Sequence, residues 1–249
     1  LIQFEQGLGD AILMSRYVAL LEQRGARCWI QAPPALMTLL QRSFPRSRVV
    51  PLDDCPADVE FRIPIMSLPL ALRTFGESDI PGVVPYLVAD EQKAARWAPR
   101  LAARGARVVG LAWRGNPRYR DDQQRSAKLE TVLPLLARKD VQFVALPHDV
   151  TEVETAELAR HDNVTVPGTD QFSFDDLAAI VSVLDVVISV DSAPAHLAGA
   201  LGRPTWVLLS SKPLWCWQLG RSDSPWYPTA RLFRQTAPGQ WAGVVDDVS

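Results

Sequence analysis

The segment from Asp185 to Gly202 constrains the fold of this chain more than any other stretch. It contains an apolar run, DVVISV, then a short polar turn, DSAPAH, and then an alanine-rich stretch that ends in glycine. The apolar run is typical of a buried parallel strand, and a serine followed closely by proline is typical of a helix start, where Ser192 is expected to cap the helix. We therefore expect a strand, a tight turn and a helix, which is the repeating unit of an α/β protein.

This turn is also a candidate binding site. A helix that begins at the carboxyl end of a parallel strand presents unpaired backbone N–H groups, and its dipole favours a bound anion. Ser192 and His196 add side-chain donors, so the turn suits a diphosphate. The same spacing is equally compatible with an ordinary capped turn that binds nothing. The candidate residues are Asp191, Ser192, Ala193, Pro194, Ala195 and His196.

Composition narrows the classes of protein that are compatible with the chain. Its 249 residues can bury a core as one large domain or two small ones, and the balance of 47% hydrophobic and 22% charged residues with a net charge of −2 argues against nucleic-acid binding. We see no signal peptide and no apolar run of about 18 residues, the length that a membrane span needs. The three cysteines are scattered, which predicts buried free thiols in a reducing, cytoplasmic compartment.

Strand-like and helix-like segments alternate along the chain, which predicts parallel sheets covered by helices on both faces. We expect a strand at 1–4, a turn at 7–10 and a helix over 11–23 that Gly25 closes. Further strands are expected at 48–51, 58–63 and 107–113, and a helix at 129–138. The best domain boundary lies near 89–106. We therefore predict two Rossmann-like domains, 1–90 and 91–249, with the ligand in the cleft between them.

Two motifs and the residues that follow the second resemble a known family. The residues GLGDA at 7–11, DSAPAH at 191–196 and AGALGRP at 198–204 resemble glycosyltransferase family 9, the heptosyltransferase-like enzymes of the GT-B fold. The tail from 223 to 235 is similar to the branch that forms the C-terminal domain of bacterial tetratricopeptide-repeat proteins. Because Leu1 already lies in a strand-like run, we expect the chain to belong to a longer protein with such a repeat domain upstream.

The resemblance implies a reaction. It implies inverting transfer of a sugar from a nucleotide diphosphate donor to a hydroxyl of a glycan, a lipid-linked glycan or a protein, without a metal or another cofactor. The protein would lie in the cytoplasm or at the periphery of the inner membrane, and its C-terminal helix could cross back to the first domain. Asp10 matches the family's general base, although the residues alone are also compatible with a helix cap.

The resemblance also extends the candidate donor site. The family takes a basic residue from the loop after the first strand of the C-terminal domain, and here we favour Arg125 with Ser126, since a guanidinium can make paired hydrogen bonds to a phosphate. A solvated basic loop is the alternative. Close backbone approach to a ligand is one use of the glycine pair at 7 and 9, and the turn itself is another. Further candidate nucleotide or sugar contacts are Gly7, Gly9, Trp113, Arg114, Asn116 and Lys212.

Other interpretations stay open at this point. Ala193 stands where the family usually has glycine, which favours divergence from it. The chain could be a catalytically silent module that binds a sugar nucleotide or serves as a scaffold, or an epimerase or hydrolase on the same fold. Four tryptophans could line a sugar or base site or simply pack in the core. They are Trp215, Trp217, Trp226 and Trp241.

Overall fold

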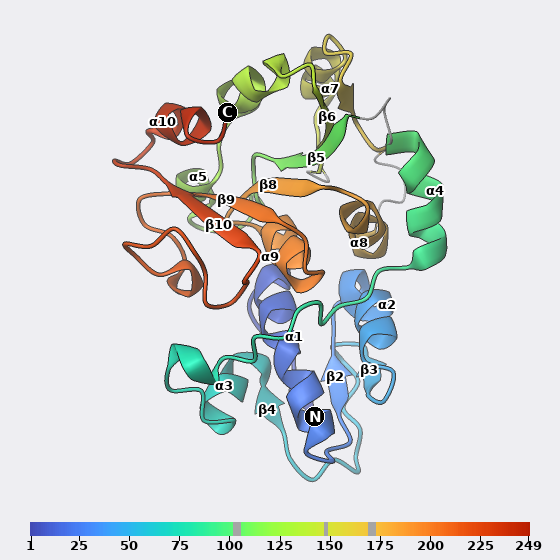
Figure 1. The fold of residues 1–249 in the computed structure, drawn as a ribbon. Coiled ribbons are helices and arrows are strands. Elements are labelled where there is room, and N and C mark those ends of the chain that lie inside the picture. The colour runs from blue at the N-terminus through green and yellow to red at the C-terminus, as the bar shows by residue number, and fades with distance from the viewer. Residues whose placement is uncertain (102–105, 147–148, 169–172) are drawn as a thin grey trace.

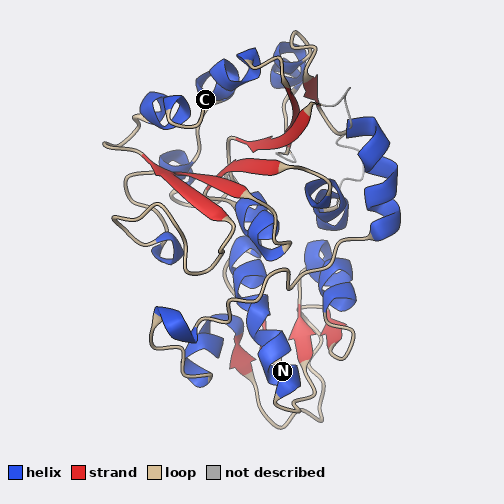
Figure 2. Ribbon diagram, viewed as in Figure 1, coloured by secondary structure: helices blue, strands red, loops and turns tan. Residues whose placement is uncertain are grey.

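Two parallel sheets form the framework of the molecule. The computed structural model describes residues 1–101, 106–146, 149–168 and 173–249, and Figures 1 and 2 show one sheet in each of two lobes. The N-terminal sheet has the order β3-β2-β1-β4 and the C-terminal sheet has the order β10-β9-β8-β5-β6-β7, and neighbouring strands within the described residues run parallel. The α/β class and the GT-B-like arrangement expected from the sequence are confirmed.

The N-terminal lobe alternates short strands with helices. Its strands are β1 (Ile2–Gln3), β2 (Trp29–Gln31), β3 (Arg48–Val50) and β4 (Ile63–Pro64), and its helices are α1 (Leu8–Gln23), α2 (Pro34–Ser43) and α3 (Leu68–Ala71). Of the strand expected over 58–63, only the last residue pairs, because β4 begins at Ile63. The proline-rich stretch that follows forms single turns of helix and leads to α4 (Glu91–Leu101).

The C-terminal lobe contains the longer strands. They are β5 (Arg107–Ala112), β6 (Val141–Ala145), β7 (Val164–Thr165), β8 (Val186–Val190), β9 (Thr205–Leu209) and β10 (Ala230–Arg234). The helices are α5 (Asp122–Arg125), α6 (Leu129–Val132), α7 (Glu152–Leu158), α8 (Phe174–Ser182), α9 (Ala193–Ala200) and α10 (Trp241–Asp246).

Three local expectations for this chain were wrong. The first helix begins at Leu8 and not at residue 11, because Gly7 is extended and its N–H donates to Asp10 Oδ2 at 3.0 Å. The helix expected over 129–138 changes to a 3-10 helix at Leu133, next to Pro134, which has no N–H to donate. The C-terminal helix α10 packs against α6 in its own lobe and does not cross back.

The two lobes are in direct contact. Helix α1 packs on α9, while α2 and α4 pack on α8, as Figure 1 shows. Arg42 of α2 bonds to the carboxylates of Asp90 and Asp175, which ties the first lobe to α8. A single cluster of buried apolar side chains runs from one lobe into the other. Helices from both lobes therefore fill the interface between the two sheets. Their packing places the start of α1 against the start of α9.

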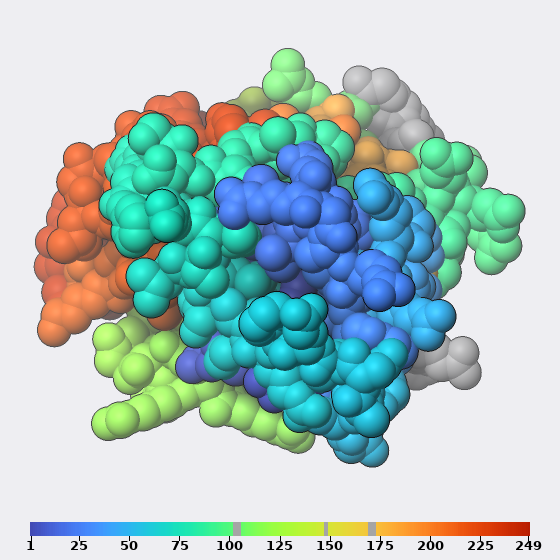
Figure 3. All heavy atoms as spheres, turned by 90° about the horizontal axis from the view of Figure 1, so that it is seen from below, coloured from blue at the N-terminus to red at the C-terminus, as the bar shows by residue number. Residues whose placement is uncertain are grey.

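Seen from the N-terminal side, the blue and cyan residues of the first lobe cover most of the molecule (Figure 3). Within the described part of the chain, no helix combines the length and the apolar character that crossing a membrane requires.

Candidate functional site

The structure brings the two sequence motifs together. A Cβ built on Gly9 would lie 2.8 Å from His196 Cδ2 and 3.7 Å from the Cα of Ala193. The first turn of α1 therefore lies directly on the turn before α9. Glycine is needed here because a side chain would collide with the imidazole. Gly9 thus serves a close approach between the two lobes.

Asp191 is buried and organises the turn. Only 2% of the residue is exposed, and its carboxylate accepts hydrogen bonds from Trp217 Nε1 at 2.7 Å and from the Leu214 N–H at 3.3 Å. Burial raises the pKa of this carboxyl, the Trp217 and Leu214 donors and the charge of Arg125 oppose that rise, and the nearby Asp10 charge adds to it. Asp191 therefore fixes the segment 214–217 against the turn, and lies within electrostatic range of both Asp10 and Arg125.

His196 is neutral and faces the interior. Its ring stacks on Trp217 with centroids 5.1 Å apart, and its Nδ1 lies 3.0 Å from the Tyr227 hydroxyl. Burial lowers its pKa to about 3, and the charges of Arg16 and Arg125 act in the same direction. With 3% exposure, His196 supports the turn from behind in this conformation.

Ser192 occupies the N-cap position without capping the helix, which corrects the sequence-based expectation. Its hydroxyl lies 3.1 Å from Ser189 Oγ and donates to the Val190 carbonyl at 3.2 Å. The N–H groups of Ala195 and His196 both point to the Ser192 carbonyl. Ala193 and Pro194 are the two residues of the turn that are partly exposed. In this conformation, an anion at the turn would contact these two residues.

Arg125 is the last residue of the short helix α5, within the connection after β5 where the sequence placed it. Its Nε donates to Asp122 Oδ1 at 2.9 Å, and its guanidinium lies 4.4 Å from the centre of the Tyr119 ring. Ser126 Oγ donates to the other oxygen of Asp122 and accepts the Gly115 N–H, both at 2.9 Å. The sequence reasoning missed Asp122, although a carboxylate three residues before the arginine was the available signal.

Two other candidates in this loop are structural. Trp113 has no exposed surface, and its Nε1 donates to Glu154, so it belongs to the core and cannot contact a nucleotide. Arg114 donates through all three of its nitrogens to Glu154 and to Asp149. Its charge is therefore neutralised. Asn116 is exposed and accepts the Arg118 N–H, and Gly7 is exposed beside Asp10.

A buried arginine missed by the sequence reasoning connects the lobes. Arg16 of α1 is 2% exposed, and its Nη1 donates to the Trp226 carbonyl at 2.6 Å and to the Pro81 carbonyl at 3.2 Å. Its Nη2 donates to the Tyr86 hydroxyl, which lies 3.4 Å from the Tyr227 hydroxyl. Three aromatic rings surround the guanidinium. This chain of contacts continues through Tyr227 to His196, and so reaches the turn.

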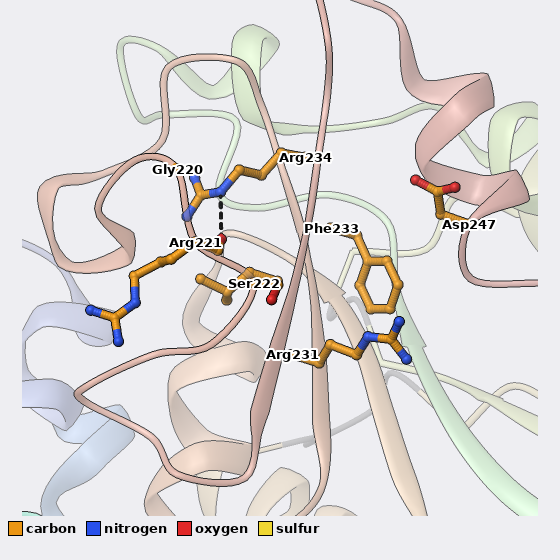
Figure 4. Close-up of a pocket in the computed structure, with 8 residues that line it drawn as sticks. Gly220, Arg221, Ser222, Arg231, Phe233, Arg234 and Asp247 are labelled. Carbon is orange, nitrogen blue, oxygen red and sulfur yellow. Dashed lines mark hydrogen bonds between the residues drawn. The ribbon is translucent and has the colours of Figure 1, made fainter.

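A cavity lies away from these motifs, at the outer edge of β10. It has a volume of about 570 Å³, and Figure 4 shows Arg221, Arg231 and Arg234 around it. Arg221 is paired with Glu77 and Asp223, and Arg234 donates to backbone carbonyls, including that of Arg221. A smaller cavity of about 380 Å³ is lined by Lys212 and Trp215. Trp215 is 53% exposed, whereas Trp217, Trp226 and Trp241 are buried.

No group of three or more His, Cys, Asp or Glu side chains within the described ranges is arranged to hold a metal ion. The charge of Arg125 acts on both Asp191 and His196, and that of Arg16 acts on His196.

Comparison with known proteins gives a consistent result. The model of glycosyltransferase family 9 (heptosyltransferase) matches residues 130–213, which include the turn at 191–196. Protein FlbA of Caulobacter vibrioides is 26% identical over 97% of this chain, and the chain spans 44% of the length of that relative.

Solved structures share the fold. Heptosyltransferase II of E. coli superposes with a TM-score of 0.58 at 13% identity, covering 100% of this chain and 98% of that one. A family 9 glycosyltransferase from Veillonella parvula gives 0.61 at 12% identity, covering 100% and 90%. The iron-containing dodecameric glycosyltransferase TibC from enterotoxigenic E. coli gives 0.54 at 16% identity, covering 83% and 57%. The family 9 model therefore matches part of the C-terminal lobe, including the turn, and the whole chain shares its fold with solved heptosyltransferases.

Proposed function

We propose that this chain is a sugar transferase that uses a nucleotide diphosphate sugar as donor. The donor binds along the edge formed by Ala193, Pro194 and Arg125. The sugar passes to an acceptor hydroxyl that Asp10 deprotonates. The observation that carries the proposal is the convergence of opposite charges at one turn. Gly9, the neighbour of Asp10 in α1, lies against Ala193 and His196 of the turn. The charges of Arg125, from the loop after β5, and of Asp10 both act on the Asp191 carboxyl. A cation for the leaving group and a base for the acceptor therefore flank the same turn.

The chemistry assigned to these residues is a single displacement. The acceptor oxygen attacks the anomeric carbon while the bond from that carbon to the diphosphate oxygen breaks, and the configuration inverts. Asp10 takes the acceptor proton, and the nucleoside diphosphate leaves with its negative charge. Proton abstraction by a positioned carboxylate contributes about 10²- to 10⁴-fold to such reactions.

Charge stabilisation of the leaving group is assigned to Arg125, so that the displacement proceeds without a metal. A guanidinium that is fixed in place before the reaction stabilises the leaving group more than a mobile one does, because it needs no reorganisation as charge develops. The N–H of Ala193 at the start of α9 would add to it. Asp191, Ser192 and His196 support the turn, and a direct His196 contact with the donor requires the first turn of α1 to move off the imidazole.

One observation favours a second candidate, a silent sugar-nucleotide-binding module. The Asp10 carboxylate already accepts the Gly7 N–H, which is the bond expected of a purely structural helix cap. In that case the chain would bind the nucleotide and show no transfer.

A thermal-shift screen tests the donor proposal. The purified chain is titrated with ADP, UDP, GDP, CDP and sugar conjugates of each. A ligand at about 100 times its dissociation constant raises the stability by about 2.7 kcal/mol, which gives a clear shift. The proposal expects a shift with at least one nucleotide. A chain that responds to none of them is not a nucleotide-sugar transferase of the proposed kind, and a chain that binds one but transfers no sugar supports the silent module.

A further inference from the structure

Arg125 is a half-buried cation whose terminal nitrogens are not used by the protein, whereas Arg118, Arg120 and Lys128 of the same loop are exposed. Within the described ranges, its one hydrogen bond is the side-on contact from Nε to Asp122 Oδ1, which leaves the four N–H groups of Nη1 and Nη2 without a protein acceptor. The side chain is 15% exposed. Arg114, by contrast, is fully engaged. Unused charged donors on a largely buried side chain indicate a place for a ligand's oxygens.

The side-on contact is built by several residues together. The Asp122 carboxylate is 11% exposed, and its second oxygen is held by Ser126 Oγ, which is in turn held by the Gly115 N–H. The Tyr119 ring lies on the face of the guanidinium. Ser126 and Gly115 thus fix the Asp122 carboxylate in place, and the carboxylate accepts a hydrogen bond from Arg125 through Nε alone.

Gly115 has a specific steric role in this arrangement. A Cβ at residue 115 would lie 2.7 Å from Arg125 Nη2 and 2.7 Å from Asp122 Oδ1. The guanidinium and the carboxylate therefore occupy the space that any other residue would fill. Residue 115 must therefore be glycine for this pair to pack against the backbone, and no sequence pattern indicates this.

We infer that Asp122 is a positioning residue for the donor site: it holds Arg125 by Nε so that Nη1 and Nη2 face the diphosphate, with Gly115 providing the space. This inference rests on the proposed function, because it presumes that Arg125 binds the diphosphate. It adds that the affinity for the anion depends on the acceptor oxygen of a side chain that is itself an anion. A carboxylate near an anion site lowers the affinity by repulsion, so positioning makes the opposite prediction from simple electrostatics.

The test is a double-mutant cycle on anion binding, measured by calorimetry with inorganic pyrophosphate and with the nucleoside diphosphate that the thermal-shift screen selects. Asp122→Ala is expected to weaken binding about tenfold, and Arg125→Ala about 10- to 100-fold. In the Arg125→Ala background, Asp122→Ala is expected to have no further effect, because Asp122 acts through the arginine. Asp122→Asn keeps an acceptor for Nε and is expected to recover most of the affinity.

Asp121→Ala is the matched control, since it removes the same charge from an exposed neighbour and should change binding less than twofold. Gly115→Ala should weaken binding as Asp122→Ala does. Circular dichroism melting checks that each variant is folded. Unchanged or tighter binding by Asp122→Ala, or an equal loss in both backgrounds, overturns the inference. Failure of the wild-type chain to bind any of these anions overturns the proposed function itself, which keeps the two failures distinct.

Discussion

The Cα of Gly9 lies against the imidazole of His196, so close that a Cβ at residue 9 would come within 2.8 Å of that ring. The two residues belong to different lobes and are separated by most of the chain. This contact fixes the start of α1 on the turn before α9, and it sets where Asp10 stands relative to the donor edge.

This contact predicts the effect of a methyl group. Gly9→Ala should lower the free energy of unfolding by about 1–3 kcal/mol, because overpacking at a buried contact forces the neighbouring side chain or backbone to shift. Gly243→Ala is the control, since nothing lies within 4 Å of a Cβ there and the residue is within α10. Urea denaturation should show the control unchanged or slightly more stable. Equal effects of the two changes would show that the Gly9 contact is not tight.

Arg16 should contribute strongly to stability. Arg16→Met removes the donors to the Trp226 and Pro81 carbonyls and to the Tyr86 hydroxyl, and leaves these polar groups buried without a partner. We expect a loss of about 2–4 kcal/mol in the free energy of unfolding. Arg24→Met, at the exposed end of the same helix, should change it by less than about 0.5 kcal/mol. Similar losses for the two variants would contradict the proposed link between the lobes.

His196 should make the protein sensitive to mild acid. Its pKa is about 3 in the folded chain, against an ordinary value of 6.5, so the unfolded chain takes up a proton first as the pH falls. The stabilising contribution is complete above pH 6.5 and is lost as the pH falls towards 3, by at most about 1.4 kcal/mol per pH unit. Asp191, whose pKa is raised by burial, has the opposite effect, because the folded chain takes up that proton before the unfolded chain does.

The measurement for His196 uses the window from pH 6.5 to 5, where a histidine of the unfolded chain takes up its proton. Ring ¹⁵N chemical shifts should show a neutral imidazole throughout this window, and His196→Gln should flatten the dependence of unfolding free energy on pH. His161→Gln is the control for a histidine outside the turn. A His196 ring that titrates near pH 6.5 would mean that it is open to solvent.

A substitution at Asp10 should affect the rate of sugar transfer and leave nucleotide binding unchanged. Asp10→Asn should reduce kcat at least 100-fold by removing the proton acceptor, while the affinity for the nucleoside diphosphate stays the same. The amide oxygen can still accept the Gly7 N–H, so the stability should change by less than about 1 kcal/mol. Asp53→Asn, an exposed carboxylate of the first lobe, is the control. Full activity in Asp10→Asn would leave Asp10 as a helix cap only.

The sequence was sufficient to predict the α/β class and the strand-turn-helix around Asp191, because apolar runs and punctuating glycines determine local structure. Gly25 and Gly202 do adopt positive φ angles of 85° and 68° just after their helices. The exposure of individual side chains was less predictable. Trp113 and Arg125 belong to the same loop region, and only tertiary packing decides that the tryptophan is buried while the arginine keeps unused donors.

Partners that are distant in sequence were the least predictable. The contacts of Arg16 with residues near 81 and 226, and the space that Gly115 leaves for Arg125, depend on how the lobes and loops meet. No periodicity or spacing encodes them in a single sequence. The local pair Asp122 and Arg125 could have been recognised from its i,i+3 spacing, since such residues are neighbours on a helical turn.

Calorimetric titration of the nucleoside diphosphate into the wild-type chain, Arg125→Ala and Arg120→Ala tests the central claim most directly. If Arg125 receives the donor diphosphate, its replacement should raise the Kd about 10- to 100-fold, while replacement of the exposed Arg120 in the same loop should change it less than about twofold. Equal affinities for the wild type and Arg125→Ala would contradict the assignment of the donor site to this turn and loop.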